Sequence, residues 1–330
     1  MRDAPLATDP AVARAVEILR GGGLVAFPTE TVYGLGADAG NEAAVHRIFS
    51  AKQRPADHPL IVHLPDASHL GRWAAAVPET AARLAAAFWP GPLTLVLERA
   101  AGVLDAVTGG QDTVGLRVPF HPLALDLLRA FGGGIAAPSA NRFGRLSPTA
   151  VTHVLAELGD DVDLILDGGQ CAVGIESTIV DVSGALPRLL RPGGIGLDAL
   201  AEVIGREIRP AGADAPRAPG RLAAHYAPRA TMVLVDADGL AEAVRSHLRS
   251  GRQVAVFARQ PAPPLAGVIP ARAPDSAAAY ARVMYRALRE LDETGADVLL
   301  VEVVPDAPEW LAIRDRLARA AQRDLGDDEP

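Results

Sequence analysis

The sequence predicts an α/β protein of two domains joined by a linker. Short apolar segments with strand spacing alternate with amphipathic segments of helical spacing throughout the 330 residues. A chain of this length suits two domains. Between residues 205 and 228 the composition shifts to Pro, Ala, Gly and Arg, which is typical of an interdomain connection. We therefore expect domains at 1–205 and 229–330, with a linker at 206–228.

Helices are predicted where apolar residues recur with a period near 3.6 and a cap or a glycine marks an end. The segment 11–20 stops at three glycines, and Asn41 can cap a helix from residue 42 to about 51. Further helices are expected at 78–88, 121–131, 197–204, 240–250, 277–290 and 310–321. Ser147 precedes Pro148, which is typical of an N-cap with proline at the first helical position.

Strands are predicted at short apolar runs bounded by turn residues. In the first domain they are expected at 24–28, 60–64, 93–97, 113–119, 134–137, 164–166, 177–181 and 188–191. Residues 29–36 are polar and bear glycines, so they are expected to form a turn. In the second domain the strands 232–235, 254–257 and 298–303 alternate with helices, which predicts a parallel sheet.

The composition excludes several classes of protein. Hydrophobic residues make up 49% and aromatic residues only 4%, so we expect packed cores built from Ala, Val, Leu and Ile. The formal net charge of -8 argues against a broad nucleic-acid-binding surface. Cys171 is the only cysteine, which excludes a disulfide framework and a thiolate metal site, and we expect a buried, inert thiol. With no apolar signal core and no run of membrane-spanning length, a cytoplasmic protein is expected.

The most informative single residue is Lys52. Of the 32 basic residues, all but this one are arginine. Lysine is a compact point charge and arginine a flat fork, so a site can require one where a surface accepts either. With an extended backbone, Lys52 and Arg54 would point to the same side and bind phosphate or carboxylate. The alternative is a solvated helix end.

Polar residues of the first domain gather at strand ends and turns, where α/β folds place their binding sites. They are Thr31, Lys52, Arg54, His63, Arg117, Ser139, Asn141, Ser147, Ser177 and Arg191. Each also has a structural interpretation. His63 could be a core histidine satisfied by one backbone bond, and Ser139 and Asn141 could hold their own turn. Arg117 either lines a cavity or extends to the surface.

The chemistry that this set allows is limited. It contains no local signature of a catalytic carboxylate pair, a metal cluster or a Ser-His-Asp triad. The chain also lacks the usual glycine-rich loops of NTPases and dinucleotide-binding domains. Cations and hydroxyls remain, and these suit the positioning of anionic groups, as in nucleotidyl transfer.

Several motifs occur in an order that resembles a known family. They are 28–36 (PTETVYGLG), 52–55 (KQRP), 138–141 (PSAN), 147–149 (SPT), 177–181 (STIVD) and 191–193 (RPG). Together they resemble the YrdC-like family in its long, two-domain form, that of the threonylcarbamoyl-AMP synthases. The resemblance covers about 10–205. The C-terminal match is looser and is based on 225–228 (HYAP) and 310–317.

The resemblance implies a twisted, open, mixed sheet with a concave cationic cavity, and a smaller Rossmann-like C-terminal domain. It implies that L-threonine, bicarbonate and ATP give threonylcarbamoyl-AMP, diphosphate and water. Mg²⁺ would arrive with ATP, with no metal site of the protein's own. The product would pass to a tRNA threonylcarbamoyl-transfer complex acting beside the anticodon, with at most weak tRNA binding by this chain and no membrane contact.

The resemblance also implies roles for individual residues. The threonine pocket would consist of Thr31, His63, Arg117, Ala137 and Ser177. The residues facing ATP would be Lys52, Arg54, His58, Thr113, Ser139, Asn141, Ser147, Arg191 and Tyr226. Of these, Lys52, Arg54, Ser139 and Asn141 would be catalytic. The linker segment 221–228, with Tyr226, would close over the nucleotide as a lid.

Three other functions stay open at this point. The cationic cavity could belong to an RNA-binding module of the same fold, which the acidic net charge opposes. A YrdC-like domain also occurs in larger carbamoyltransferases, but their cysteine-rich zinc segments do not fit one cysteine. A catalytically silent relative is opposed by the intact Lys52-x-Arg54 and Ser139-x-Asn141 pairs.

Overall fold

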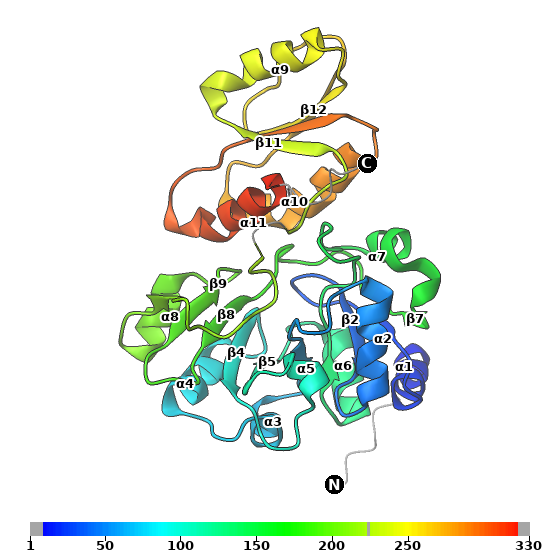
Figure 1. Cartoon of the computed structure of the whole chain (residues 1–330), viewed down its shortest axis with the longest axis vertical. Coiled ribbons are helices and arrows are strands. Elements are labelled where there is room, and N and C mark those ends of the chain that lie inside the picture. Colours follow the sequence, from blue (N-terminus) through cyan, green and yellow to red (C-terminus); the bar gives the residue numbers. More distant parts are fainter. Residues whose placement is uncertain (1–8, 223–224, 323–330) are drawn as a thin grey trace. The chain divides into compact units, whose positions relative to one another are not determined.

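The chain folds into two compact units. The computed structural model describes residues 9–222 and 225–322 (Figure 1). The first unit comprises the residues up to 143 together with 148–172 and 176–221. The second comprises 144–147, 173–175 and the residues from 222 onward. The boundary along the chain therefore falls inside the segment 206–228.

The first unit is built on a mixed sheet. Within the described residues its strand order is β10-β9-β8-β4-β5-β3-β6-β2-β1-β7. The strands are β1 Val25–Phe27, β2 Gly34–Asp38, β3 Ile61–His63, β4 Leu93–Glu98, β5 Thr113–Arg117, β6 Ile135–Ala136, β7 Leu164–Ile165, β8 Thr178–Asp181, β9 Arg188–Arg191 and β10 Arg209–Pro210. The pairs β3–β5 and β4–β8 are parallel, whereas β4–β5 and β8–β9 are antiparallel. The mixed sheet implied by the resemblance is confirmed.

Helices cover this sheet. They are α1 Pro10–Arg20, α2 Glu42–Lys52, α3 Leu70–Trp73, α4 Glu79–Phe88, α5 Asp105–Thr108, α6 Pro122–Phe131, α7 Val151–Leu158 and α8 Leu197–Ile204, with short 3₁₀ turns at Ala67–His69 and Gly159–Asp161. In Figure 1, α4 and α8 lie near β8 and β9, and α1, α2 and α6 lie near β2. The predicted cap is confirmed, since the Asn41 side chain accepts a hydrogen bond from Ala44 N at 3.2 Å. The core is mainly aliphatic, as the composition predicts.

The second unit is a parallel α/β sheet. Its strands are β11 Thr231–Val235, β12 Val254–Ala258, β13 Val268–Arg272 and β14 Val298–Glu302, in the order β11-β14-β12-β13. Its helices are α9 Leu240–Arg249, α10 Ala277–Asp292 and α11 Leu311–Ala321, with 3₁₀ turns at Ala237–Gly239 and Pro308–Trp310. Figure 1 shows α9 on one face of the sheet and α10 and α11 on the other. The predicted parallel sheet is confirmed.

Two predictions about local structure are wrong. Residues 34–36, expected within the turn 29–36, instead begin the strand β2. The elements α3, α5, β10 and β13 were not expected at all. Ser147 does not cap a helix, because α7 begins at Val151 and the Pro148 carbonyl accepts a hydrogen bond from Tyr33 N at 2.9 Å.

The first half of the segment 206–228 is packed on the first unit. β10 extends the sheet by pairing with β9. Ala218 is 9% exposed and joins a cluster with Ile61, Val96 and Ile179. The Gln111 side chain accepts from Arg217 N at 2.6 Å and donates to Arg217 O at 3.2 Å. These contacts fasten the segment across the strands that carry the predicted site.

No helix within 9–222 and 225–322 combines the length and the apolar character needed to cross a membrane.

Candidate active site

A pocket opens on the first unit where the carboxyl ends of β3 and β5 meet the start of β8. Its empty volume, including the part open to solvent, is about 440 Å³. Its lining residues are Thr29, Thr31, Val32, Gly34, Ile61, His63, Arg117, Ala137, Pro138, Ser139, Glu176, Ser177, Arg191 and Pro219. All five residues expected to bind threonine therefore line one pocket, together with Ser139 and Arg191 from the set expected to face ATP.

Arg117 supplies a cation to this pocket from the end of β5. Its Nη2 lies 2.7 Å from Oε1 of Glu30, and both side chains are only 5% exposed. Its Nε donates to Gly91 O at 3.3 Å. The second carboxylate oxygen of Glu30 accepts from Phe120 N at 3.0 Å. Arg117 thus lines a cavity, as one of the two sequence interpretations expects, and it is held there by a carboxylate that sequence reasoning missed.

His63 lies beside Arg117, because the two residues are register partners on β3 and β5. Its ring is buried and meets the edge of Phe27 at 5.8 Å between centroids. Burial, and secondarily the Arg117 charge, lower the pKa of His63 to about 3. The imidazole is therefore neutral near pH 7 and only weakly basic, so a hydrogen-bonding role suits it better than proton abstraction.

Ser177 and Arg191 form a second polar corner of the pocket. Arg191 Nη2 donates to Ser177 O at 3.0 Å and to Ser177 Oγ at 3.2 Å. The Ser177 hydroxyl also lies 2.8 Å from that of Thr94 on β4. A residue expected to bind threonine and one expected to face ATP are thus in direct contact, which is the proximity that joining two substrates requires.

The turn between β1 and β2 is organised by two threonines. Thr29 Oγ1 donates to Val32 O at 2.7 Å and lies 2.8 Å from Thr31 Oγ1. It also accepts from the backbone N–H groups of Thr31 and Val32, each at 3.2 Å. Thr29 therefore fixes the loop that presents Thr31 to the pocket.

Lys52 is buried at the end of α2, with 1% of its surface exposed. Its Nζ donates to Ser139 O and to Asn141 O, both at 2.5 Å. Burial, and then the Arg54 charge, lower its pKa well below the usual value. Gln53 adopts a left-handed conformation with φ of 53°, so the backbone at 52–54 is not extended. Lys52 instead holds the turn 139–141. This turn carries Ser139 and Asn141, which are expected to be catalytic together with Lys52 and Arg54.

Arg54 and His58 share an aromatic neighbour. The Arg54 guanidinium carbon lies 5.5 Å from the centre of the Phe143 ring, and His58 meets the same ring edge-on at 5.2 Å. Arg54 Nη2 donates to Pro59 O at 3.2 Å. Burial, followed by the Arg54 charge, lowers the pKa of His58. Thr113 lines a smaller neighbouring hollow with Gln111, and the two hollows share Ile61 and Pro219.

The chain matches two known family models, one in each part of its length. The Sua5/YciO/YrdC family model, described as telomere recombination, matches residues 17–193. A second model, described as the C-terminal domain of threonylcarbamoyl-AMP synthase, matches residues 195–322. The chain belongs to the Sua5/YciO/YrdC family, in its long two-domain form.

Individual relatives agree over nearly the whole chain. The threonylcarbamoyl-AMP synthase of Pyrococcus abyssi is 43% identical over 322 residues, which is 93% of each chain. That of Bacillus subtilis is 41% identical over 326 residues, covering 95% of this chain and 93% of its own. The structure of P. abyssi Sua5 complexed with L-threonine superposes with a TM-score of 0.89 and 42% identity, covering 94% of both chains.

Two residues expected at the Sua5-type site lie in segments of the second unit. Ser147 is fully buried within 144–147. Tyr226 is 1% exposed, with its ring centre 5.9 Å from that of Tyr285 and 5.1 Å from the Arg316 guanidinium carbon. Its φ of 63° is unusual for a bulky residue, and such strain concentrates at functional positions. Residues 223–224 of the expected lid lie outside the described residues, so closure by Tyr226 stays a prediction.

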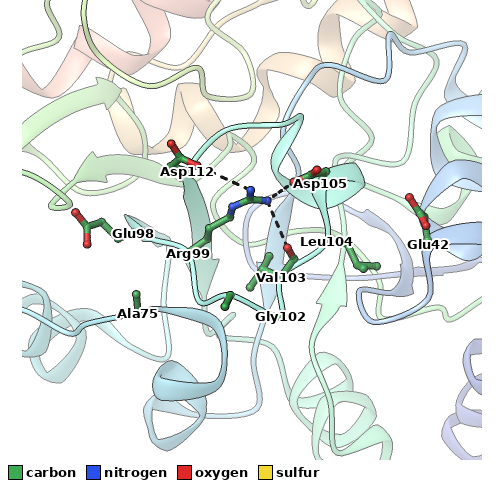
Figure 2. Close-up of a pocket in the computed structure, with 10 residues that line it drawn as sticks. Glu42, Ala75, Glu98, Arg99, Gly102, Val103, Leu104, Asp105 and Asp112 are labelled. Atoms are coloured by element: carbon green, nitrogen blue, oxygen red, sulfur yellow. Dashed lines mark hydrogen bonds and ion pairs between the residues drawn. The ribbon is translucent and has the colours of Figure 1, made fainter.

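A wider hollow on the first unit has the wrong charge for this chemistry (Figure 2). Its ionisable lining residues are the acids Glu42, Glu98, Asp105 and Asp112 and one base, Arg99. The Arg99 guanidinium is already paired with Asp105, and lies 3.8 Å from Asp112. Carboxylates in excess repel phosphate and carboxylate groups. None of the expected site residues lines this hollow.

The polar residues at the site that sequence reasoning missed include Thr29, Glu30, Thr94, Gln111 and Glu176. Glu30 stands between two threonines of the 28–36 motif, and Glu176 directly precedes Ser177. A position inside a motif, or directly beside one, was the available signal for these two glutamates. Gln111 stands in an unremarkable turn, and its contact with residue 217 is not visible in the sequence. Within the described residues, no cluster of three His, Cys, Asp or Glu side chains could hold a metal ion.

Proposed function

We propose that this chain is an L-threonylcarbamoyladenylate synthase, a nucleotidyltransferase that uses L-threonine, bicarbonate and ATP. The single observation that carries the proposal is the convergence of Thr31, His63, Arg117, Ala137 and Ser177 on one pocket that also contains Arg191. The relatives named threonylcarbamoyl-AMP synthase and the threonine complex of P. abyssi Sua5 support the same activity.

In the proposed reaction, threonine is bound through its carboxylate and its hydroxyl. The Nη1 side of the Arg117 guanidinium receives the carboxylate in a charge-assisted hydrogen bond. Thr31, Ser177 and the backbone at Ala137 provide hydrogen bonds to the rest of the amino acid. His63, held neutral by burial, orients the substrate as a hydrogen-bonding partner.

The chemistry then needs alignment more than acid–base catalysis. Threonine nitrogen adds to the carbon of bicarbonate, and water leaves to give the carbamate. A carbamate oxygen attacks the α-phosphorus of ATP, the bond from that phosphorus to the bridging oxygen breaks, and diphosphate leaves. Arg54 and Arg191 offset phosphate charge, and Lys52 fixes the turn that carries Ser139 and Asn141. His58, Thr113, Ser147 and Tyr226 complete the proposed ATP set.

Mg²⁺ enters with ATP as part of the substrate and offsets charge on the leaving diphosphate. The product serves a separate transfer to adenosine beside the tRNA anticodon, so the proposed partner is a tRNA threonylcarbamoyl-transfer complex. The reaction belongs in the cytoplasm, since it uses ATP and serves tRNA. The net charge of -8 supports at most weak binding of tRNA by this chain itself.

The test is diphosphate release from MgATP, with threonine and bicarbonate each present or omitted. We expect release only when both are present, and its loss in Lys52→Ala. Arg129→Ala, which removes a cation that is 61% exposed on α6, is the control and should keep wild-type release. Release without threonine would point to another acceptor. No release from folded wild-type protein would contradict the proposal and favour an RNA-binding module.

A further inference from the structure

We propose that Glu30 is a positioning residue for the amino-acid substrate, holding the Arg117 guanidinium in the orientation that receives the substrate carboxylate. This inference rests on the proposed function. It assigns a role to a residue that does not line the pocket and acts only through Arg117.

The first argument is geometric. Arg117 is anchored at two of its three nitrogens, with Nε donating to Gly91 O at 3.3 Å and Nη2 lying 2.7 Å from Glu30 Oε1. Nε and Nη2 form one edge of the guanidinium, so this edge is committed to the protein. Arg117 also lines the pocket, and among the described residues its Nη1 has no hydrogen-bond or ion-pair partner. The two anchors therefore leave Nη1 for a ligand.

The second argument is that Glu30 is itself held. Its Oε2 accepts from Phe120 N at 3.0 Å, three residues beyond Arg117 along the chain. One carboxylate thus connects the end of β5 to the strand–turn segment that bears Thr29 and Thr31. A carboxylate with one oxygen on each partner fixes both groups, because turning toward the pocket would cost it the ion pair with Arg117 or the hydrogen bond from Phe120 N.

The third argument is electrostatic. A buried guanidinium without a counter-charge is strongly unfavourable, and the Glu30 carboxylate offsets that cost. An arginine side chain has several rotatable bonds, so without its partner the guanidinium would leave the pocket or pair elsewhere. Glu30 therefore orders the Arg117 guanidinium before the substrate binds. The site is preorganised, so substrate binding does not have to supply the free energy of this ordering.

The test is a steady-state comparison of wild type with Glu30→Gln, which keeps shape and the acceptor for Phe120 N but removes the charge. We expect the KM for L-threonine to rise about 10- to 100-fold, the loss typical of one charge-assisted hydrogen bond. The KM for ATP should stay within about twofold. Discrimination between L-threonine and L-threoninamide, which lacks the carboxylate, should shrink by the same factor as the threonine KM rises.

Asp181→Asn is the matched control. Asp181 is fully buried and bonded to Arg188 at 2.8 and 3.0 Å, but it does not line the pocket. It should lose thermal stability as Glu30→Gln does and keep the wild-type KM for threonine. If the two variants lose stability alike and neither changes the threonine KM or the discrimination, Glu30 is only structural and the inference is overturned.

A variant that fails to fold leaves a second route. Glu30→Asp keeps the charge and withdraws the carboxylate by one methylene, so it should raise the threonine KM without changing that for ATP. An unchanged threonine KM in folded Glu30→Asp and Glu30→Gln overturns the inference. If wild type releases no diphosphate, the proposed function fails separately, and equilibrium dialysis of labelled L-threonine still decides whether Glu30→Gln weakens binding.

Discussion

The buried ammonium group of Lys52 holds the turn that carries two other residues of the expected catalytic set. Its two carbonyl partners belong to Ser139 and Asn141, so removing it releases the turn that presents both side chains. We predict that Lys52→Ala abolishes diphosphate release. Lys52→Arg should lower it at least about tenfold, because a guanidinium is too large and flat for a fully packed ammonium site. The measurement is turnover at saturating substrates.

Lys52→Met is the control that separates charge from volume, since it keeps an unbranched apolar stem of similar length. It should fold less stably, because two buried carbonyls lose their donor, and it should be as inactive as Lys52→Ala. Near-normal turnover in Lys52→Met would show that the ammonium group is dispensable.

His63 predicts a specific dependence of stability on pH. The unfolded chain binds a proton at His63 with a pKa near 6.5, whereas the folded chain does so only near pH 3. Between these values the folded state binds fewer protons, so stability rises with pH across the window and is lost as pH falls. Each unit below 6.5 costs about 1.4 kcal/mol from this residue.

Urea denaturation at pH 6.5 and pH 5 measures this effect. Wild type should lose roughly 2 kcal/mol more than His63→Gln over that interval, because the variant lacks the titrating group while carboxylates titrate in both. Equal losses in the two proteins would mean that His63 is protonated as readily in the folded state as in the unfolded chain.

At the scale of elements, Gly193, two residues beyond the end of β9, allows the chain to pass close to the start of β8. A Cβ at this position would lie 2.3 Å from Thr178 N and 2.4 Å from the carbonyl carbon of Ser177. These are backbone atoms, so the contact cannot be relieved by rotating a side chain. We predict that Gly193→Ala loses about 1 to 3 kcal/mol of stability and raises the KM for threonine, because Ser177 must shift.

The control for Gly193 lies in the connection between the same two strands. A Cβ added to Gly184 would meet no atom within 4 Å. Gly184→Ala should therefore keep both the wild-type melting temperature and the wild-type threonine KM. A Gly193→Ala variant as stable and active as Gly184→Ala would contradict the close approach.

The elements also show why the sequence predicted some of the fold and not the rest. Helices such as α1 and α2 have caps and periodic faces that are local in the chain. The strand β2 was missed because Gly34 and Gly36 interrupt the apolar pattern. A Cβ at Gly36 would lie 2.8 Å from side-chain atoms of both Ile135 and Phe27. Gly36 is therefore required by close neighbours, and one of them, Ile135, lies far away in the sequence.

The same reasoning applies to the site. Pocket residues standing in ordered motifs could be predicted, because a motif is readable locally. Pairs such as Glu30 with Arg117, or Gln111 with Arg217, join residues 87 and 106 positions apart and depend on the sheet register. The sequence analysis considers an extended backbone at 52–54. In the structure the helix α2 continues through Lys52 and ends at Gln53, which has a left-handed conformation.

At the scale of the whole molecule, each unit has its own hydrophobic core. The cluster with Leu240, Val254 and Leu300 belongs to the second unit, whereas the pocket residues expected to bind threonine all belong to the first. A ligand stabilises those parts of a protein that must be folded for its binding site to exist. Threonine should therefore act unequally on the two units.

We predict that L-threonine slows amide hydrogen exchange in β4 and β5 of the first unit more than in β12 and β14 of the second. When the free threonine concentration is 100 times its dissociation constant, binding adds about 2.7 kcal/mol to the free energy of opening the first unit, which must be folded to bind threonine. Exchange followed by mass spectrometry, with and without threonine, measures both sheets in one sample. Glu30→Gln at the same threonine concentration should show a smaller gain in β4 and β5. Equal protection of both sheets would mean that the two units open as one cooperative body, so that a ligand held by the first stabilises the whole chain.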